Sequence, residues 1–245
     1  MSTPAVSVVL PAHNEAELLR PSVDEIVKGL LERGEDFEVV VVENGSRDDT
    51  LEIARRAAGE IEQLRVVALP DADYGRAIAR GFSEARAPVV VLFDVDYFDL
   101  QFLDEAVGIL GDGRTGIVLA SKRAPGSEDR RPLPRRLLTA AFTAAMRGLL
   151  RLPVTDAHGM KAISAVRCEQ LVRAAVMGGS LFDVELVARA SRAGIPIVEL
   201  PARVEERRPP RTPLGRRSLE SAVGLLRLRL LIDRESAPPG RRHRP

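Results

Sequence analysis

The chain alternates between short apolar runs and longer segments in which apolar residues recur at helical spacing. Apolar runs that predict strands buried on both faces lie at residues 6–10, 37–42, 64–69 and 89–93. The segments between these runs, residues 15–33, 48–58 and 75–87, have the apolar spacing of amphipathic helices. Strand–helix alternation of this kind predicts right-handed crossovers and a mostly parallel sheet with helices on both faces.

The second half of the chain follows a less regular pattern. Helices are predicted at residues 100–110, 137–150, 166–176 and 181–193, and strands at 116–121 and 195–200. Prolines and charged residues predict a mobile loop over residues 123–134 and irregular structure over 205–215. We therefore expect one α/β domain over residues 1–215, a basic amphipathic helix over 216–233 and a disordered tail over 234–245.

Composition narrows the class of protein. A chain of 245 residues with 45% hydrophobic residues suffices for one large α/β core. Aromatic residues make up 4% with no Trp, which disfavours a stacking platform, so no nucleic-acid partner is expected. The single cysteine excludes an internal disulfide. No apolar stretch approaches the roughly 18 residues of a membrane span and no signal peptide precedes the first strand, so we expect a cytoplasmic protein.

Polar residues follow the first four predicted strands at the points where they end. Ligands of an open parallel sheet bind outside the carboxyl ends of its strands, so these residues are the candidate binding site. Together with the apolar residues beside them, the candidate binding residues at these strand ends are Pro11, Ala12, Asn14, Glu15, Glu43, Asn44, Ser46, Asp71, Gly75, Asp94, Val95 and Asp96. Neither a dinucleotide-binding glycine pattern nor a P-loop occurs, so we expect a metal and arginines to hold any diphosphate.

Asp94 and Asp96 are the candidate metal ligands. An Asp-x-Asp at the end of a buried strand aims two carboxylates at one point if the chain turns there, and hard divalent ions such as Mg²⁺ or Mn²⁺ take oxygen ligands. The alternative interpretation is a solvated turn or a helix N-cap. The neighbouring strand ends favour a metal site, since they bring further carboxylates and amides to the same edge.

These motifs occur in the order of a known family. They are Pro11-Ala12-His13-Asn14-Glu15, residues 42–50, the helix that starts at Gly75, and Asp94-Val95-Asp96. In sequence and spacing they resemble family-2 glycosyltransferases of the GT-A fold. Residues 121–123, 156–161, 182–186 and 197–211 are similar to the dolichyl- or polyprenyl-phosphate mannose and glucose synthase branch. The chain departs from the pattern at Asn44, where the family has Asp, and at Phe98, where that branch often has Gln.

The resemblance implies an inverting transfer of one sugar from a UDP- or GDP-sugar to an acceptor, such as a polyprenyl phosphate. The implied catalytic residues are Asp156, Asp183, Arg207, Arg208 and Arg211. The arginines would contact the diphosphate or an acceptor phosphate. Asp156 or Asp183 would act as base if the acceptor were a hydroxyl. His158 stays open between a metal ligand, an acceptor contact and a structural hydrogen bond.

Two other functions remain possible from the residues. A sugar-phosphate nucleotidyltransferase also uses paired aspartates, but it usually has a glycine-rich loop after the first strand, where this chain has none. A non-catalytic nucleotide-sugar-binding module would be favoured if Asp94 and Asp96 bound no metal. With Phe98 in place of a third ligand, we expect the free protein to bind metal weakly and the substrate diphosphate to complete the site.

The C-terminal region is strongly basic. Residues 203–245 contain twelve arginines and five acidic residues. An apolar stripe runs along the predicted helix through Leu219, Ala222, Val223, Leu226 and Leu230. This pattern fits a helix lying on an anionic membrane surface, which would make the protein peripheral on the inner face of the membrane. The alternatives are a helix docked on the domain with a solvated arginine fringe, and a dimer contact.

Overall fold

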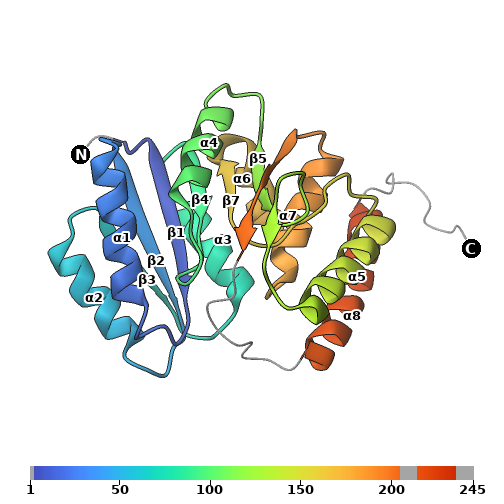
Figure 1. Ribbon diagram of the computed structural model, residues 1–245, viewed down its shortest axis with the longest axis horizontal. Coiled ribbons are helices and arrows are strands. Elements are labelled where there is room, and N and C mark those ends of the chain that lie inside the picture. The colour runs from blue at the N-terminus through green and yellow to red at the C-terminus, as the bar shows by residue number, and fades with distance from the viewer. Residues whose placement is uncertain (1–2, 205–213, 236–245) are drawn as a thin grey trace, which may run out of the picture.

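The computed structural model describes residues 3–204 and 214–235, the latter with side chains from Ala222 onward (Figure 1). In this part of the chain a seven-stranded sheet has the order β3-β2-β1-β4-β7-β5-β8. The strands are β1 (Val6–Ala12), β2 (Phe37–Asn44), β3 (Leu64–Leu69), β4 (Val89–Leu92), β5 (Ile117–Ser121), β7 (Lys161–Ser164) and β8 (Ile197–Pro201). All neighbours are parallel except β7, which is antiparallel to β4 and β5.

Strand β7 is the main element that the sequence pattern missed. It is four residues long and is followed at once by α6 (Ala165–Ala174), so it lacks the length and the bounding turns by which a strand is recognised. Its register places Lys161 opposite Leu92, at the carboxyl end of β4. Because β7 is antiparallel, the residues before it reach the same edge of the sheet as the residues after β1, β2, β3 and β4.

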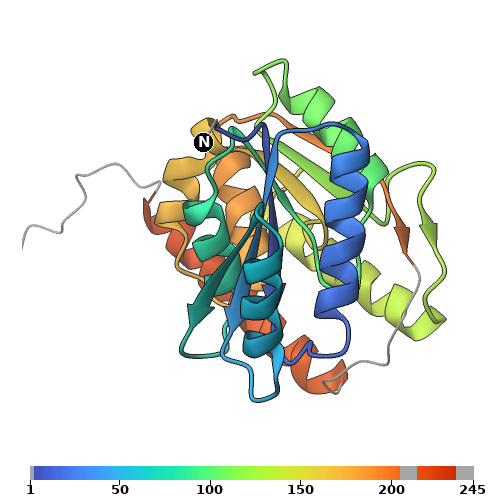
Figure 2. The same cartoon turned by 90° about the vertical axis from the view of Figure 1, so that its left-hand side faces the viewer.

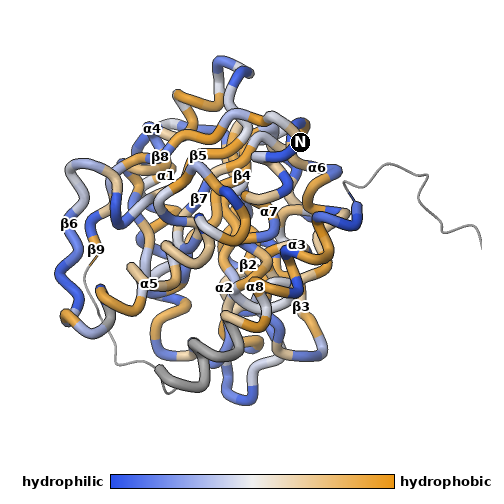
Figure 3. The backbone as a smooth tube through the Cα atoms, turned by 90° about the vertical axis from the view of Figure 1, so that its right-hand side faces the viewer, coloured by the Kyte–Doolittle hydropathy of each residue, from blue (hydrophilic) through white to orange (hydrophobic). Residues whose placement is uncertain are grey.

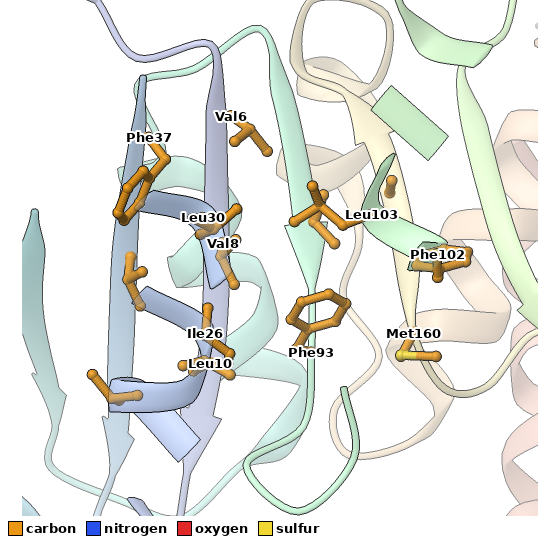
Figure 4. Packing of buried hydrophobic residues seen from close by; sticks show 14 of the residues in the cluster. Val6, Val8, Leu10, Ile26, Leu30, Phe37, Phe93, Phe102, Leu103 and Met160 are labelled. Carbon is orange, nitrogen blue, oxygen red and sulfur yellow. The ribbon is translucent and has the colours of Figure 1, made fainter. Parts of the chain in front are cut away.

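Helices cover both faces of the sheet (Figure 2). One face packs against α1 (Leu19–Glu32), α2 (Thr50–Glu60) and α4 (Leu100–Leu110). The other packs against α3 (Tyr74–Glu84), α5 (Leu133–Leu150), α6, α7 (Leu181–Arg192) and α8 (Leu214–Glu235). Figure 4 shows the first of these cores, where Ile26 and Leu30 of α1 meet Val8 and Leu10 of β1. Burial on both faces explains why the strands are continuous apolar runs.

Several predicted boundaries were wrong. Helix α1 begins at Leu19 rather than at Glu15, because residues 16–18 form a turn in which Leu18 N donates to Glu15 O (3.1 Å). Helix α5 begins at Leu133, with Pro134 in its first turn, where a proline is tolerated. Helix α8 already includes Leu214 and runs to Glu235.

The predicted mobile loop over residues 123–134 contains a short strand. This strand, β6 (Glu128–Asp129), pairs in parallel with β9 (Arg203–Val204). The pair is hydrophilic and lies at the edge of the molecule in Figure 3. Its hydrogen bonds run from Glu128 N to Ala202 O and from Arg130 N to Val204 O, both at 3.0 Å. They fix the segment after β5 to the segment after β8.

Close approach of α3 to the sheet requires a glycine. A Cβ atom at Gly81 would lie 2.2 Å from Val9 Cγ1, whereas one at Gly108 of α4 would meet no atom within 4 Å.

We expect Gly81→Ala to lower the free energy of unfolding. Overpacking of a core costs about 1–3 kcal/mol, and this cost outweighs the roughly 1 kcal/mol that alanine gains over glycine in helix propensity. Gly108→Ala, the matched control, should raise it by about 0.5–1 kcal/mol. Urea unfolding measures both, and equal effects would contradict this account of the packing.

Candidate functional site

The loops that follow β1 and β2 are hydrogen-bonded to each other. Asn14 has a left-handed backbone (φ 55°), its N–H donates to Ser46 Oγ (2.9 Å), and its Oδ1 accepts from Arg47 N (2.8 Å). Such a conformation costs energy in a non-glycine residue and is tolerated best by Asn and Asp. Asn14 is therefore held at the edge of the sheet by the β2 loop.

Asn44 joins the β2 loop to the loop after β3. Its side chain is buried, and its Oδ1 accepts a hydrogen bond from Asp73 N (2.8 Å). Asp73 in turn caps α3 by accepting from Arg76 N (3.0 Å), and it accepts from Gly179 N (2.9 Å). The side-chain oxygen of Asn44 thus links the loops that follow β2 and β3.

The remaining predicted nucleotide contacts differ in how open they are. Glu43 is buried and its Oε1 accepts from Ser46 N (2.6 Å), so this carboxylate also shapes the β2 loop. Asp71 is exposed, and Gly45 (φ 61°) packs directly against its backbone. Pro11 and Ala12 are buried in β1. A Cβ atom at Gly75 would lie 2.9 Å from Gly179 O, so this glycine allows α3 to pack against the segment before α7.

Asp94 and Asp96 lie on a tight turn directly after β4. Asp94 and Tyr97 exchange two backbone hydrogen bonds of 3.1 Å, and Ser22 Oγ of α1 donates to Val95 O (2.6 Å). Val95 turns its side chain into the core, whereas both aspartates are half-buried. The chain therefore makes the turn that a shared metal site requires. Phe98 packs its ring against that of Phe93, with centroids 6.1 Å apart.

The electrostatics around Asp94 favour a cation. Burial raises the pKa of this carboxyl group, and the charges of Asp96 and Asp183 raise it further. A hydrogen bond from Tyr74 Oη (2.8 Å) and the charge of Lys161 act in the opposite direction, and the net pKa lies above its ordinary value. A half-buried carboxylate whose charge is destabilised by a neighbouring carboxylate fits a divalent ion, which would relieve the repulsion.

Lys161 and Asp183 form a buried ion pair at this edge. The Lys161 side chain is 0% exposed, and its Nζ lies 3.0 Å from Asp183 Oδ1 and donates to Gly159 O at 2.7 Å. Burial raises the pKa of Asp183, but the charge of Lys161 and a contact with His158 outweigh it, so the pKa is lowered. Asp183 is therefore a carboxylate beside Asp94 despite being buried.

A second acid–lysine pair lies on the β5 side. Lys122 Nζ is 3.3 Å from Asp156 Oδ2, and the backbone N–H of His158 donates to Asp156 Oδ1 (3.0 Å). Burial raises the pKa of Asp156, but Lys122 and this N–H bring it below its ordinary value. Glu199 of β8 holds the segment by accepting from Thr155 N (2.9 Å) and Asp156 N (3.0 Å).

The fold thus brings the predicted site residues from both halves of the chain to one edge of the sheet. The exceptions are Arg207, Arg208 and Arg211, which lie outside the described residues. Sequence reasoning did not single out Tyr74 as a partner of Asp94, nor Lys161 and Lys122 as partners of the acids. Lys161 is the last residue of the segment 156–161 that resembles the family, but the sequence does not indicate that its side chain is buried.

The Lys161–Asp183 pair generates a stability prediction. Lys161→Met leaves a buried carboxylate without its counter-charge, and we expect a loss of about 3–5 kcal/mol in the free energy of unfolding near neutral pH. Since the lysine lowers the folded pKa of Asp183, the wild-type pair loses its stabilisation as the pH falls through that pKa, and the deficit of the variant should shrink.

Urea unfolding over a pH series measures this effect. Lys28→Met is the matched control, because Lys28 pairs with Glu32 at 3.8 Å on an exposed surface, with side chains 77% and 65% exposed. That variant should change stability by less than about 0.5 kcal/mol. Similar losses in both variants would show that the buried pair has no special role.

Within residues 3–204 and 214–235, no helix combines the length and apolar character that crossing a bilayer demands.

Two known proteins match about four fifths of this chain. AglD of Haloferax volcanii is 34% identical over 201 residues, which are 80% of this chain and 32% of AglD, so the chain spans about a third of that protein. Dolichyl-phosphate beta-glucosyltransferase ALG5A of Trichomonas vaginalis is 26% identical over 213 residues, covering 82% of this chain and 66% of that protein.

A solved structure shares the fold. It is glucosyl-3-phosphoglycerate synthase from Mycobacterium tuberculosis in complex with Mn²⁺, UDP-glucose and phosphoglyceric acid. The TM-score is 0.69 at 25% identity, over 92% of this chain and 80% of that one. The predicted GT-A sheet, mostly parallel and flanked by helices, is confirmed. Residues 7–170 match the sequence profile of Glycosyl transferase family 2, and the chain belongs to this family.

Proposed function

We propose that the protein transfers a sugar, with inversion and with a divalent metal, from a UDP-sugar to an acceptor that carries a phosphate. The turn from Asp94 to Tyr97 is the observation that carries this proposal, since it presents two carboxylates at the edge where the β1, β2 and β3 loops meet. The synthase that shares the fold was crystallised with Mn²⁺ and UDP-glucose, which supports the choice of donor.

Asp94 and Asp96 would hold Mg²⁺ or Mn²⁺. Within the described residues, no group of three or more His, Cys, Asp or Glu side chains is arranged to bind a metal. Phosphate oxygens and water would therefore complete the coordination, as is common for Mg²⁺. When bound, the ion would neutralise charge that develops on the departing diphosphate.

The chain's own residues prepare this edge for the donor. Tyr74 orients Asp94 through its hydroxyl, and the Lys161 ammonium offsets the negative charge of Asp94 and Asp183. Asn14 and Glu43 are fixed by the hydrogen bonds of the β1 and β2 loops, and on this proposal they would line the nucleoside site. Preorganised groups of this kind need no rearrangement during the reaction.

A basic cavity beside the β5 end suits an acceptor phosphate. It has a volume of about 230 Å³ and is lined by Lys122, Arg123, Asp129, Arg136 and Thr139. Asp129 pairs with Arg131 (2.7 Å) and Lys122 with Asp156, so Arg123 and Arg136 give the cavity a net positive charge. Arginine forks bind phosphate oxygens well. ALG5A is named for dolichyl phosphate and the synthase binds phosphoglyceric acid, and both acceptor types carry phosphate.

Turnover of nucleotide sugars tests this function. With Mn²⁺ or Mg²⁺ and a panel of UDP- and GDP-sugars, acceptor-dependent release of UDP is expected. Asp94→Asn and Asp96→Asn should each lower kcat by about a hundredfold or more, because they remove several kcal/mol of transition-state stabilisation. Asp104→Asn is the control, since it removes the same charge from an exposed aspartate of α4 that pairs with Arg33.

Two results would contradict the proposal. One is full activity in both aspartate variants. The other is pyrophosphate release from a sugar phosphate and UTP, which would identify a nucleotidyltransferase. Mn²⁺ titration with and without UDP belongs to the same experiment, and tight binding by the free protein would contradict a site that the diphosphate completes.

The pair of helices α5 and α8 extends the proposal to a membrane partner. These helices pack on each other and carry Leu133, Leu137, Val223, Leu226 and Leu230, which are five of the eight exposed large hydrophobic side chains of the described residues. Helix α8 docks on the domain through Leu225, Leu228 and Ile232, and the described part of the predicted stripe, residues 222–230, is exposed at Ala222, Val223, Leu226 and Leu230. Helix α5 contains arginines and no acidic residue. Apolar side chains beside arginines suit an anionic bilayer surface.

Vesicle co-sedimentation tests this surface. Leu226→Glu with Leu230→Glu should weaken binding to vesicles of phosphatidylcholine and phosphatidylglycerol by about tenfold or more, because two apolar contacts are replaced by repelled charges. Val166→Glu is the matched control, since Val166 is 84% exposed but lies on α6. Equal binding by all variants, or wild-type binding to neutral vesicles alone, would exclude the proposed contact.

A further inference from the structure

His158 lies between the acids of the donor edge and the basic cavity. Its backbone N–H donates to Asp156 Oδ1 (3.0 Å), and its carbonyl oxygen accepts from Lys122 Nζ (3.3 Å). Lys122 lines the basic cavity, whereas Asp156 is anchored to Glu199 of β8. The position of this histidine is therefore fixed by the same residues that shape the acceptor side of the site.

The imidazole ring has a defined orientation. Its Nδ1 faces Asp183 Oδ2 of α7 at 3.7 Å, and its ring lies 5.1 Å from that of Phe142 of α5, centroid to centroid. The side chain is 30% exposed, while that of Asp183 is 2% exposed. No hydrogen bond to His158 Nε2 occurs within the described part of the chain. A buried carboxylate on one nitrogen with the other nitrogen open is the arrangement that orients a histidine for proton transfer.

The two nearby carboxylates are less suited to take a proton. Burial raises the pKa of Asp156 and of Asp183, but each has a lysine partner that brings it below its ordinary value. Lys122 lies 3.3 Å from Asp156, and Lys161 lies 3.0 Å from Asp183. A carboxylate whose charge is stabilised in this way is a weak base. Among side chains, the imidazole is the commonest general base in enzymes.

We propose that His158 is the general base of the transfer and that Asp183 is its positioning residue, an inference that rests on the proposed function. It assigns the nucleophile as a hydroxyl of a phosphate-bearing acceptor. The hydroxyl O–H bond breaks and its proton moves to Nε2 of His158. The oxygen forms a bond to the anomeric carbon while the bond from that carbon to the diphosphate breaks, and the bonding electron pair leaves with UDP.

The charge around His158 agrees with this role. The charged groups that face it are Asp183 of α7, Asp156 of its own loop and Lys122 after β5, while α5 contributes the uncharged Phe142. The carboxylate of Asp183 would stabilise the imidazolium that forms. Lys122 lines the basic cavity and donates to the carbonyl oxygen of His158, so an acceptor phosphate in that cavity would lie near this histidine.

Steady-state kinetics of His158→Gln with UDP-glucose and phosphoglyceric acid test the proposal. The expected result is a loss of about 10²- to 10⁴-fold in kcat with little change in KM for either substrate or in UDP affinity. The wild-type kcat should fall as the pH is lowered, because the base must be unprotonated, and the variant should lose this limb. Added imidazole should restore activity to His158→Ala, which a structural role would not produce.

The outcomes are distinguishable. Wild-type rates in His158→Gln, or no rescue by imidazole in a folded, UDP-binding His158→Ala, would overturn the inference. So would transfer by the wild type to a polyprenyl phosphate alone, because a phosphate oxygen has no proton to lose, and the proposed function would then stand. Failure of the wild type to turn over UDP-glucose with either acceptor would overturn the proposed function itself.

Discussion

A buried ammonium group organises the centre of this molecule. Lys161 is fully buried at the start of β7, and an unpaired charge in that position would be too costly to tolerate. Its neighbours are the carboxylate of Asp183 and the carbonyl of Gly159. This requirement ties α7 to β7 and brings Asp183 close enough to Asp94 to affect its pKa. At this edge Asp183 is stabilised by a lysine, Asp94 by a tyrosine hydroxyl, and Asp156 by a lysine and a backbone N–H.

The same edge is divided into two parts with different chemistry. Loops after β1, β2 and β3 are joined by hydrogen bonds through Asn14, Asn44 and Asp73, and they offer amides and carboxylates. The segments around β7 and β5 offer Asp156, His158 and Lys122 and open onto a basic cavity. Asp94 lies between the two parts on its turn. On the proposed function, the diphosphate of the donor and the phosphate of the acceptor would meet beside this turn.

The outer surface adds a second level of organisation. Helix α8 uses one face to complete the core and leaves the apolar stripe of its other face exposed beside α5. Arg229 links the two helices by donating to Leu149 O, and it also pairs with Asp233. An apolar helix face left exposed beside arginines is expected where a partner surface covers it.

By itself the sequence determined the parallel half of the sheet, the edge that carries the chemistry and the family. Strands buried on both faces must be continuous apolar runs, and polar residues gather where they end, so Asp94, Asp96, Asn14 and Glu43 could be placed from the pattern alone. Only the tertiary structure decided that Lys161 is buried, that it pairs with Asp183, and that His158 lies between Asp183 and Lys122. Strand β7 is too short to be recognised, and pairing between residues distant in the chain depends on its antiparallel register. Burial and charge compensation arise only when the strands and helices pack together.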